Sequence, residues 1–227
     1  MWSIGELKAK GKEAFKSNYW SSVIVALILS LLTGGAGASA RSQTSQTGGQ
    51  EGLDMSALTP EGMAVIVGAF SVIFIVALLL RIFLFNPLEV GGFRFFKKNV
   101  EGEHPTVGMI KEGFGEYGRT FITMFLRDLF LSLWTCLFII PGIVKGYSYR
   151  MVPYIIKDNP ELSATEVITK SREMMNGHKW RAFLLDLSFI GWILLTICTC
   201  GLVGIFWTNP YIQNTNAALY LELSKNQ

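Results

Sequence analysis

Apolar and polar positions divide the chain into amphipathic stretches and stretches that are almost wholly apolar. Residues 63–80 form a run of eighteen residues without a charge, which is the length and composition of a helix that crosses a membrane. Turn signals interrupt two of the longer runs, at Pro141-Gly142 and again at residues 200–204. The other apolar stretches cover residues 19–33, 121–143 and 182–207.

This pattern predicts an all-α integral membrane protein with about six transmembrane helices. We interpret residues 119–139 as a helix that returns as 142–158, and residues 179–200 as a helix that returns as 203–223. Together with the first two apolar segments, these helices make three hairpins. The alternative is four transmembrane helices followed by interfacial tails, because the returning segments are more polar than an isolated span.

A short basic amphipathic stretch precedes each hairpin, and the three stretches resemble one another. An offset of 160 residues aligns residues 7–20 with residues 167–180, so that basic positions and a tryptophan coincide. Residues 109–121 are a looser copy. Such self-similarity is typical of repeated units, each burying a face that its neighbours cover. We therefore expect a single polytopic membrane domain with units 1–98, 104–158 and 163–224.

The amphipathic stretches have the pattern of helices that lie along a membrane surface. In the third stretch, Ser163 and Glu166 form a capping-box pattern, and Asn176-Gly177 is a stop signal. We interpret these helices as a structural collar that fixes the depth of the bundle, and a docking surface for a cytoplasmic partner is the alternative. The candidate contacts to anionic lipid headgroups are Lys10, Lys12, Lys170, Arg172, Lys179 and Arg181.

Composition and charge place this architecture in a membrane. Half of the residues are hydrophobic, 16% are charged and the mean hydropathy is +0.37, which is unusual for a soluble domain of this length. Most lysines and arginines fall on one predicted side, which assigns both termini to the cytoplasm of a plasma membrane. Anionic lipid explains these cations more simply than nucleic acid does, and no nucleic-acid partner is predicted.

The segment 34–62 is rich in Gly, Ser, Thr and Gln and has no helical or strand period, so we expect a flexible external loop. A competing interpretation is a cleavable signal peptide that ends near the small residues Ala38-Ser39-Ala40. The repeat match favours residues 1–33 as the first unit of the fold instead.

Three strings carry a resemblance to a known family. They are NPLEVGGFRFF at 86–96, the segment 138–192 that begins FIIPGIVKGYSYRMVPY, and NPYIQNTNAALYLEL at 209–223. They resemble the bacterial integral-membrane family catalogued as domain of unknown function 975. The resemblance implies a multi-span plasma-membrane protein without an established activity. The family is also distantly similar to the membrane region of glycerophosphodiester phosphodiesterases, and the catalytic domain of those enzymes is not among these residues.

Placing a charged or amide side chain at membrane depth costs free energy, so such residues are candidate functional residues. Three acids and three arginines are expected to share one charge-balanced layer near the cytoplasmic side, with an amide stripe on the last helix. Either these groups pair internally and fix how the hairpins pack, or they line a water-filled vestibule. Arg81 has no predicted place. The layer comprises Glu89, Arg94, Arg127, Asp128, Arg150, Asp186, Asn209, Gln213 and Asn216.

Motifs of conventional active sites are missing from the sequence. It contains no phosphate loop, nucleophilic serine motif or zinc-protease motif, and the three cysteines are interpreted as small packing residues. We predict no catalytic residue, metal or cofactor. The expected function is a non-enzymatic scaffold or accessory protein that binds lipid or a membrane partner. A small transporter or channel component with a cytoplasm-facing polar vestibule is the alternative.

Overall fold

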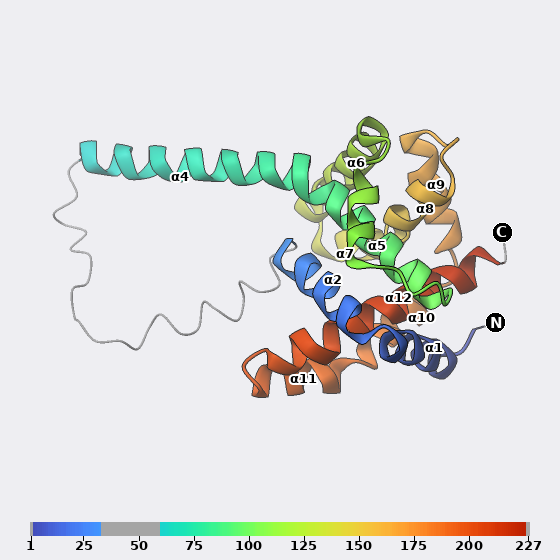
Figure 1. Ribbon diagram of the computed structural model, residues 1–227. Helices are drawn as coiled ribbons and strands as arrows, with labels where there is room; N and C mark the ends of the chain where they lie inside the picture. Colours follow the sequence, from blue (N-terminus) through green and yellow to red (C-terminus); the bar gives the residue numbers. More distant parts are fainter. Residues whose placement is uncertain (1, 33–59, 226–227) are drawn as a thin grey trace.

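The computed structural model describes residues 2–32 and 60–225, and within these ranges the regular structure is entirely helical. Figure 1 shows α4 as a long helix that extends away from a bundle formed by the others. The elements are α1 (Ile4–Ser17), α2 (Tyr19–Leu32), α4 (Pro60–Leu80), η2 (Arg81–Phe85), α5 (Asn86–Val100), η3 (Val107–Phe114), α6 (Tyr117–Leu137), α7 (Ile139–Ser148), α8 (Val152–Asp158), α9 (Ala164–Met174), α10 (Lys179–Leu187), α11 (Ile190–Cys198), η4 (Gly204–Thr208) and α12 (Asn209–Ser224).

Three helical stretches are long and apolar enough to cross a membrane: Ile66–Val100, Tyr117–Leu137 and Lys179–Cys198. The pair α1 and α2, bent by 106° between them, makes a fourth if it is counted as one span. Large apolar side chains lie exposed along these helices; Phe70 on α4, for example, is 68% exposed. Water would not favour such surfaces, whereas lipid would. The expectation of several helices able to cross a membrane is thus confirmed for three to four helices of the described ranges, and the predicted six are not confirmed.

Two of the predicted helices are interrupted in the structure. Residues 142–158 are divided between α7 and α8, which are separated by a break at residues 149–151. Residues 179–200 are likewise divided between α10 and α11, with a turn at Ser188-Phe189. The hairpin of α6 and α7 reverses at Phe138, whose backbone is extended, so that Pro141 lies in the first turn of α7, where a missing N–H group is tolerated.

Two helices begin with the same dipeptide, and each follows a π-helix. Asn86-Pro87 opens α5 after η2, and Asn209-Pro210 opens α12 after η4. In each case the asparagine N–H reaches back five residues, to the carbonyl of Arg81 or Gly204. Because proline cannot donate a backbone hydrogen bond, a widened turn next to it is a low-cost adjustment.

The amphipathic stretches agree only partly with prediction. α1 and α9 are α-helices, and each begins with a serine and glutamate capping box. Residues 109–121 do not form a single α-helix, because the 3₁₀-helix η3 ends at Phe114 and Glu116 adopts a left-handed conformation before α6. Gly113 of η3 packs directly against the Pro87 carbonyl, which leaves no room for a side chain. Close backbone packing therefore replaces the amphipathic helix expected there.

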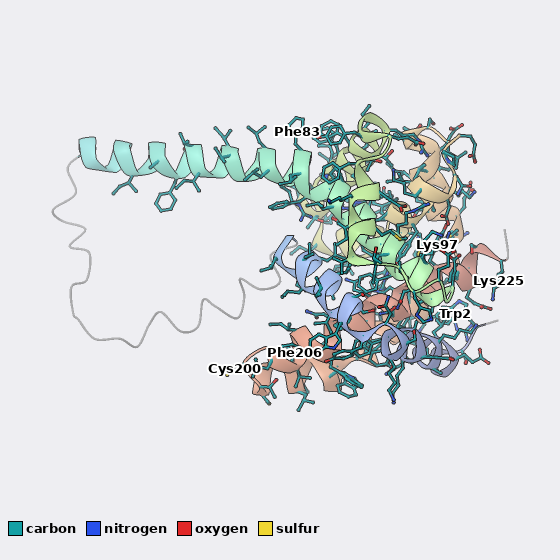
Figure 2. All side chains as sticks on the ribbon, viewed as in Figure 1. Trp2, Phe83, Lys97, Cys200, Phe206 and Lys225 are labelled. Atoms are coloured by element: carbon teal, nitrogen blue, oxygen red, sulfur yellow. The ribbon has the colours of Figure 1, made fainter. Side chains whose placement is uncertain are left out.

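The helices α5, α8 and α12 meet in the middle of the bundle and are covered by the amphipathic elements. α1 packs against α12, η3 against α5, and α9 against α8 and α6. Both ends of the chain lie on the side opposite the free end of α4 (Figure 1). Figure 2 places Trp2 and Lys225 on that side and Cys200 and Phe206 on the other. The core of this bundle holds Phe15, Phe95, Phe96, Met151, Tyr154 and Leu185, all 2% exposed or less.

The predicted external loop lies almost entirely in residues 33–59, outside the described ranges; its last three residues, 60–62, begin α4.

Candidate functional site

A first group of predicted layer residues pairs between α5 and α6. Arg127 Nη1 donates to Glu89 Oε1 at 3.0 Å, and Arg127 Nη2 lies 2.7 Å from the neighbouring Asp128 Oδ1. Arg81, which had no predicted place, lies 3.9 Å from the second Glu89 oxygen. The Arg127 and Glu89 side chains are only 11% and 10% exposed. This group holds two cations and two anions, so its formal charges cancel.

A second charge-balanced group joins the α7–α8 break to α10 and α12. Arg150 donates to both oxygens of Asp186, at 2.9 and 2.7 Å, in a two-pronged pair. Asn216 Oδ1 accepts from Arg150 at 2.7 Å, and the Tyr147 hydroxyl donates to Asp186 at 2.9 Å. Two residues of the predicted layer and one of the predicted amide stripe therefore meet, as the pairing interpretation expected.

A third group, which sequence reasoning missed, joins the three central helices. Lys97 of α5 lies 2.7 Å from Asp158 of α8, and the Tyr220 hydroxyl of α12 donates to the same carboxylate at 2.6 Å. The Tyr220 ring also stacks on Tyr154, with centroids 4.8 Å apart. The spacing of Tyr154 and Asp158 by four residues was the available signal, since it places them along one face of α8.

A buried amide network was also missed. Asn99 Nδ2 donates to the Ala14 carbonyl at 2.7 Å and to Asn214 Oδ1 at 2.8 Å, and Ser22 Oγ lies beside both asparagines. Asn99, Asn214 and Ser22 are each 1% exposed or less. The network ties α1, α2, α5 and α12 together. Asparagine is usually a surface residue, so the sequence alone gave little reason to place these two inside.

The remaining predicted layer residues lie apart from these groups. Arg94 pairs with Glu112 of η3 at 2.5 Å, which removes it from the layer. Asn209 donates to Ser30 of α2 at 3.0 Å. Gln213 Oε1 is buried and has no hydrogen-bond partner within the described residues. The single layer is therefore resolved into separate pairs that fasten neighbouring helices.

The candidate lipid contacts divide by exposure. Lys12 of α1 and Arg172 of α9 are exposed, and no ion pair to either is present in the described part of the chain. Lys10 lies 3.4 Å from Glu222, and Lys170 donates to Asn159 Oδ1. The remaining two lie less exposed at the start of α10: Lys179 is half-buried, and the Arg181 guanidinium is 4.8 Å from the Trp2 ring.

The exposed starts of α2 and α10 carry aromatic residues at repeat-related positions. Trp20 is 69% exposed and Trp180 is 68% exposed. Tryptophan is enriched where a membrane meets water, because its ring is apolar and its N–H is polar. Both residues therefore have the character of interfacial anchors.

On the amphipathic helix α9, Glu166 has a clearly shifted pKa. The Ser163 hydroxyl and backbone N–H both donate to Glu166, at 2.6 and 2.7 Å. These two bonds stabilise the charged form and lower the pKa of Glu166. The shift belongs to a helix cap and does not indicate a catalytic acid.

Cysteine and metal chemistry find little support in the described ranges. Cys136, Cys198 and Cys200 are free thiols on the exposed surface, so their interpretation as packing residues was wrong. They lie where hairpins reverse among apolar residues, and lipid can surround them there. Within residues 2–32 and 60–225, no group of three histidine, cysteine, aspartate or glutamate side chains is placed to hold a metal ion.

Comparison with known proteins gives one match. A family model described as "Protein of unknown function (DUF975)" matches residues 137–227. The match supports the family resemblance seen in the sequence over the segment from the end of α6 onward. That segment contributes Arg150, Asp186 and Asn216, whereas Glu89 and Arg127 lie before it. No curated protein and no solved structure matches the chain.

Proposed function

We propose that the chain is a non-enzymatic, multi-pass plasma-membrane protein that acts as a scaffold or accessory protein. Its basic amphipathic helices bind anionic lipid headgroups or a membrane partner on the cytoplasmic side, where both termini lie. The observation that carries the proposal is a division among the cations. Arg127 and Arg150 are neutralised by carboxylates inside the bundle, whereas Lys12 and Arg172 are exposed on α1 and α9.

The placement of the amphipathic helices supports this assignment. If α2 crosses the membrane, the 106° bend before it directs α1 along the membrane surface. Trp20, exposed at that bend, has the character of an interfacial anchor. Cations at this level attract anionic headgroups at about 1 kcal/mol each.

Three repeated units and six membrane helices are the architecture that we propose for this function. α1 and α9 have matching caps, and residues related by the 160-residue offset are buried alike, for example Leu7 and Val167. Each amphipathic element packs on the returning helix of a preceding unit, and α1 closes the ring by packing on α12. The returning helices contain most of the polar pairs, which would explain why they are less apolar than isolated spans.

Retention of lipid by single variants tests the proposal. The protein is extracted from vesicles of phosphatidylcholine and phosphatidylglycerol, and the phosphatidylglycerol that stays bound is counted by native mass spectrometry. Lys12→Glu and Arg172→Glu should each lower retention by about fivefold, because each replaces an attraction by a repulsion. Lys225→Glu, at the end of α12, is the matched control and should change retention little. If all three variants retained as much phosphatidylglycerol as the wild type, the proposal would be rejected.

A transport role is the second candidate, favoured by polar groups that are buried without partners. Both amide atoms of Asn86, the Tyr154 hydroxyl and Gln213 Oε1 have no hydrogen-bond partner among the described residues. Buried groups of this kind usually contact water. If they belong to a hydrated path, Asn86→Leu should fold normally yet abolish an ion flux measured in reconstituted vesicles. A wild-type protein without flux above empty vesicles would exclude this role.

A further inference from the structure

Three cations from three different helices gather where α7 meets α9 and α10. α7 contacts both of these helices. The charges of Arg172 on α9 and Lys179 at the start of α10 are close enough to repel the Lys145 ammonium of α7. Lys145 Nζ also lies 4.8 Å from the centroid of the Trp134 ring of α6, a distance at which a cation and an aromatic ring attract each other. We call Lys145, Arg172 and Lys179 the cation triad.

Contacts between neighbouring residues hold the three helices around the triad. Ser171 of α9, next to Arg172, donates to the Ser148 carbonyl at the end of α7 at 2.8 Å. On the other side, the Tyr147 hydroxyl of α7 donates to Asp186 of α10 at 2.9 Å. The triad is therefore assembled by bonds between its neighbours, although its own members repel one another.

The triad has no carboxylate to neutralise it within the described ranges. None of its three side chains forms an ion pair there, and all three are at least partly exposed. Asp186 of α10 is paired with Arg150. Glu173 of α9 lines a hollow along a different side of that helix, together with Lys170. Because like charges held together without a counterion repel, an anion from outside the chain would stabilise this arrangement.

Apolar side chains beside the triad indicate that a lipid carries this anion. Val144, next to Lys145 on α7, is 45% exposed, and Trp180, next to Lys179 on α10, is 68% exposed. Trp180 also stacks on Phe183, one turn further along α10. Acyl chains can cover such a surface, and tryptophan favours the boundary between headgroups and chains. A soluble anion would gain nothing from these side chains.

We propose that the cation triad binds a phospholipid with two phosphodiester groups, of the cardiolipin type. Its two phosphates are joined by one glycerol, so cations on three separate helices can contact both phosphates at once. When the first phosphate is bound, the second is already local, which favours this lipid over two separate lipids with one phosphate each. Basic pockets between helices are typical sites for such a headgroup. The inference rests on the proposed lipid-binding function and adds the headgroup that one site selects.

The first unit provides a matched junction with one cation in place of three. An offset of 160 residues relates the first unit to the third, and an offset of 62 relates the second unit to the third. Under these offsets, the counterparts of Lys145, Arg172 and Lys179 are Trp207, Lys12 and Tyr19. Trp207 packs on Phe15 of α1, with ring centroids 5.2 Å apart. Aromatic residues thus replace two of the cations, and Lys12 remains as a single basic residue for comparison.

Lipid competition in native mass spectrometry tests the proposal. Delipidated full-length protein in detergent is mixed with cardiolipin and phosphatidylglycerol of the same acyl chains, at equal concentrations of phosphate. We expect the wild type to retain about tenfold more cardiolipin. Lys145→Gln removes one cation and should reduce that preference to about twofold, whereas Lys145→Arg keeps the charge and should preserve it. Equal thermal midpoints will verify that the variants are folded.

Lys12→Gln separates this inference from the proposed function. It should lower the retention of both lipids by a similar factor, so that the preference for cardiolipin stays at about tenfold. Equal retention of the two lipids by the wild type would overturn the inference. If phosphatidylglycerol retention still depended on Lys12 in that case, the proposed function would stand.

Two further results would also overturn the inference. A preference that persists in Lys145→Gln, or that Lys12→Gln lowers as strongly, would place the selectivity outside the triad. Displacement of cardiolipin by inorganic pyrophosphate at matched concentration would show that the site takes a soluble diphosphate and not a lipid.

Discussion

The amphipathic helices α1 and α9 are built alike but are seated differently. Each starts at a serine whose glutamate partner lies three residues later, and each is followed by an exposed tryptophan. α1 packs on α12, whereas α9 packs on α6 and α8. The same local sequence pattern therefore produces the same helix, and the partner surface decides what that helix can do.

One position shows the difference most clearly. Gly11 of α1 and Ser171 of α9 are related by the 160-residue offset. A Cβ atom on Gly11 would lie 2.8 Å from the Thr215 Cα atom, so the two backbones touch there. Ser171 instead donates to the Ser148 carbonyl at 2.8 Å. The close packing of α1 brings its Ala14 carbonyl within hydrogen-bond distance of the buried Asn99 amide.

The largest expected effect concerns the start of each helix. Trp2 is 3% exposed, donates to His178 Nδ1 at 3.3 Å and lies beside Arg181, so it joins the first helix to the third unit. Trp2→Ala should cost about 3–5 kcal/mol. Its counterpart Leu162 is only half-buried, and Leu162→Ala should cost about 1 kcal/mol. Unfolding midpoints in mild detergent measure both, and equal losses would contradict the unequal seating.

Exchange of the residues at the offset position should also act unequally. Gly11→Ser forces α1 away from Thr215 and should cost about 3 kcal/mol through overpacking. Ser171→Gly removes one buried hydrogen bond and places a flexible glycine inside α9, for about 1–2 kcal/mol. The order of the two thermal midpoints is the test. A Gly11→Ser variant more stable than Ser171→Gly would show that α1 is not closely packed on α12.

The N-terminal caps of α1 and α9, in contrast, should contribute equally to stability. Ser3→Ala and Ser163→Ala each remove a capping side chain and should each cost about 1 kcal/mol. A double variant should lose the sum, because the two caps lie on different helices. A loss that is several times larger for one of them would mean that the caps also hold tertiary contacts.

The pH dependence of the α9 cap has a defined sign. Hydrogen bonds from Ser163 lower the pKa of Glu166 in the folded protein below its ordinary value of 4.5. The cap therefore contributes its full stability above that value and loses it as the pH falls through the folded pKa. The stability difference between wild type and Glu166→Ala should shrink between pH 7 and pH 3. A stability difference that grows on acidification would mean that folding raises the pKa of Glu166 and does not lower it.

Helix positions were predictable from the sequence because long apolar runs and capping patterns are local signals. Residues 63–80 and the start of α9 at Ser163 agree with the structure for this reason. The breaks at residues 149–151 and at Ser188 were not predictable in the same way. They occur where Arg150 and Asp186 pair between helices, and such a contact has no local trace in either segment.

The candidate site was predictable in its residue types but not in its partners. Arg150, Asp186 and Asn216 meet as their depth and spacing implied. Arg94 was predicted to lie in the layer because only its position along one helix was known. In the structure it forms an ion pair with Glu112 of η3 instead. Asn99 escaped notice because its importance comes from Ala14 and Asn214, which are far from it along the chain.

The two exposed tryptophans give the last and mildest test of the comparison. Trp20 and Trp180 are exposed to nearly the same fraction and should lie at the same depth in a bilayer. In reconstituted protein, lipids brominated near the headgroup should quench fluorescence more than lipids brominated near the chain ends. Trp20→Phe and Trp180→Phe should remove equal shares of that quenching with little change in stability. Unequal shares would place α1 and α9 at different depths in the bilayer. The sequence pattern that the two helices share would then explain only how each helix folds, and not where it lies relative to the membrane.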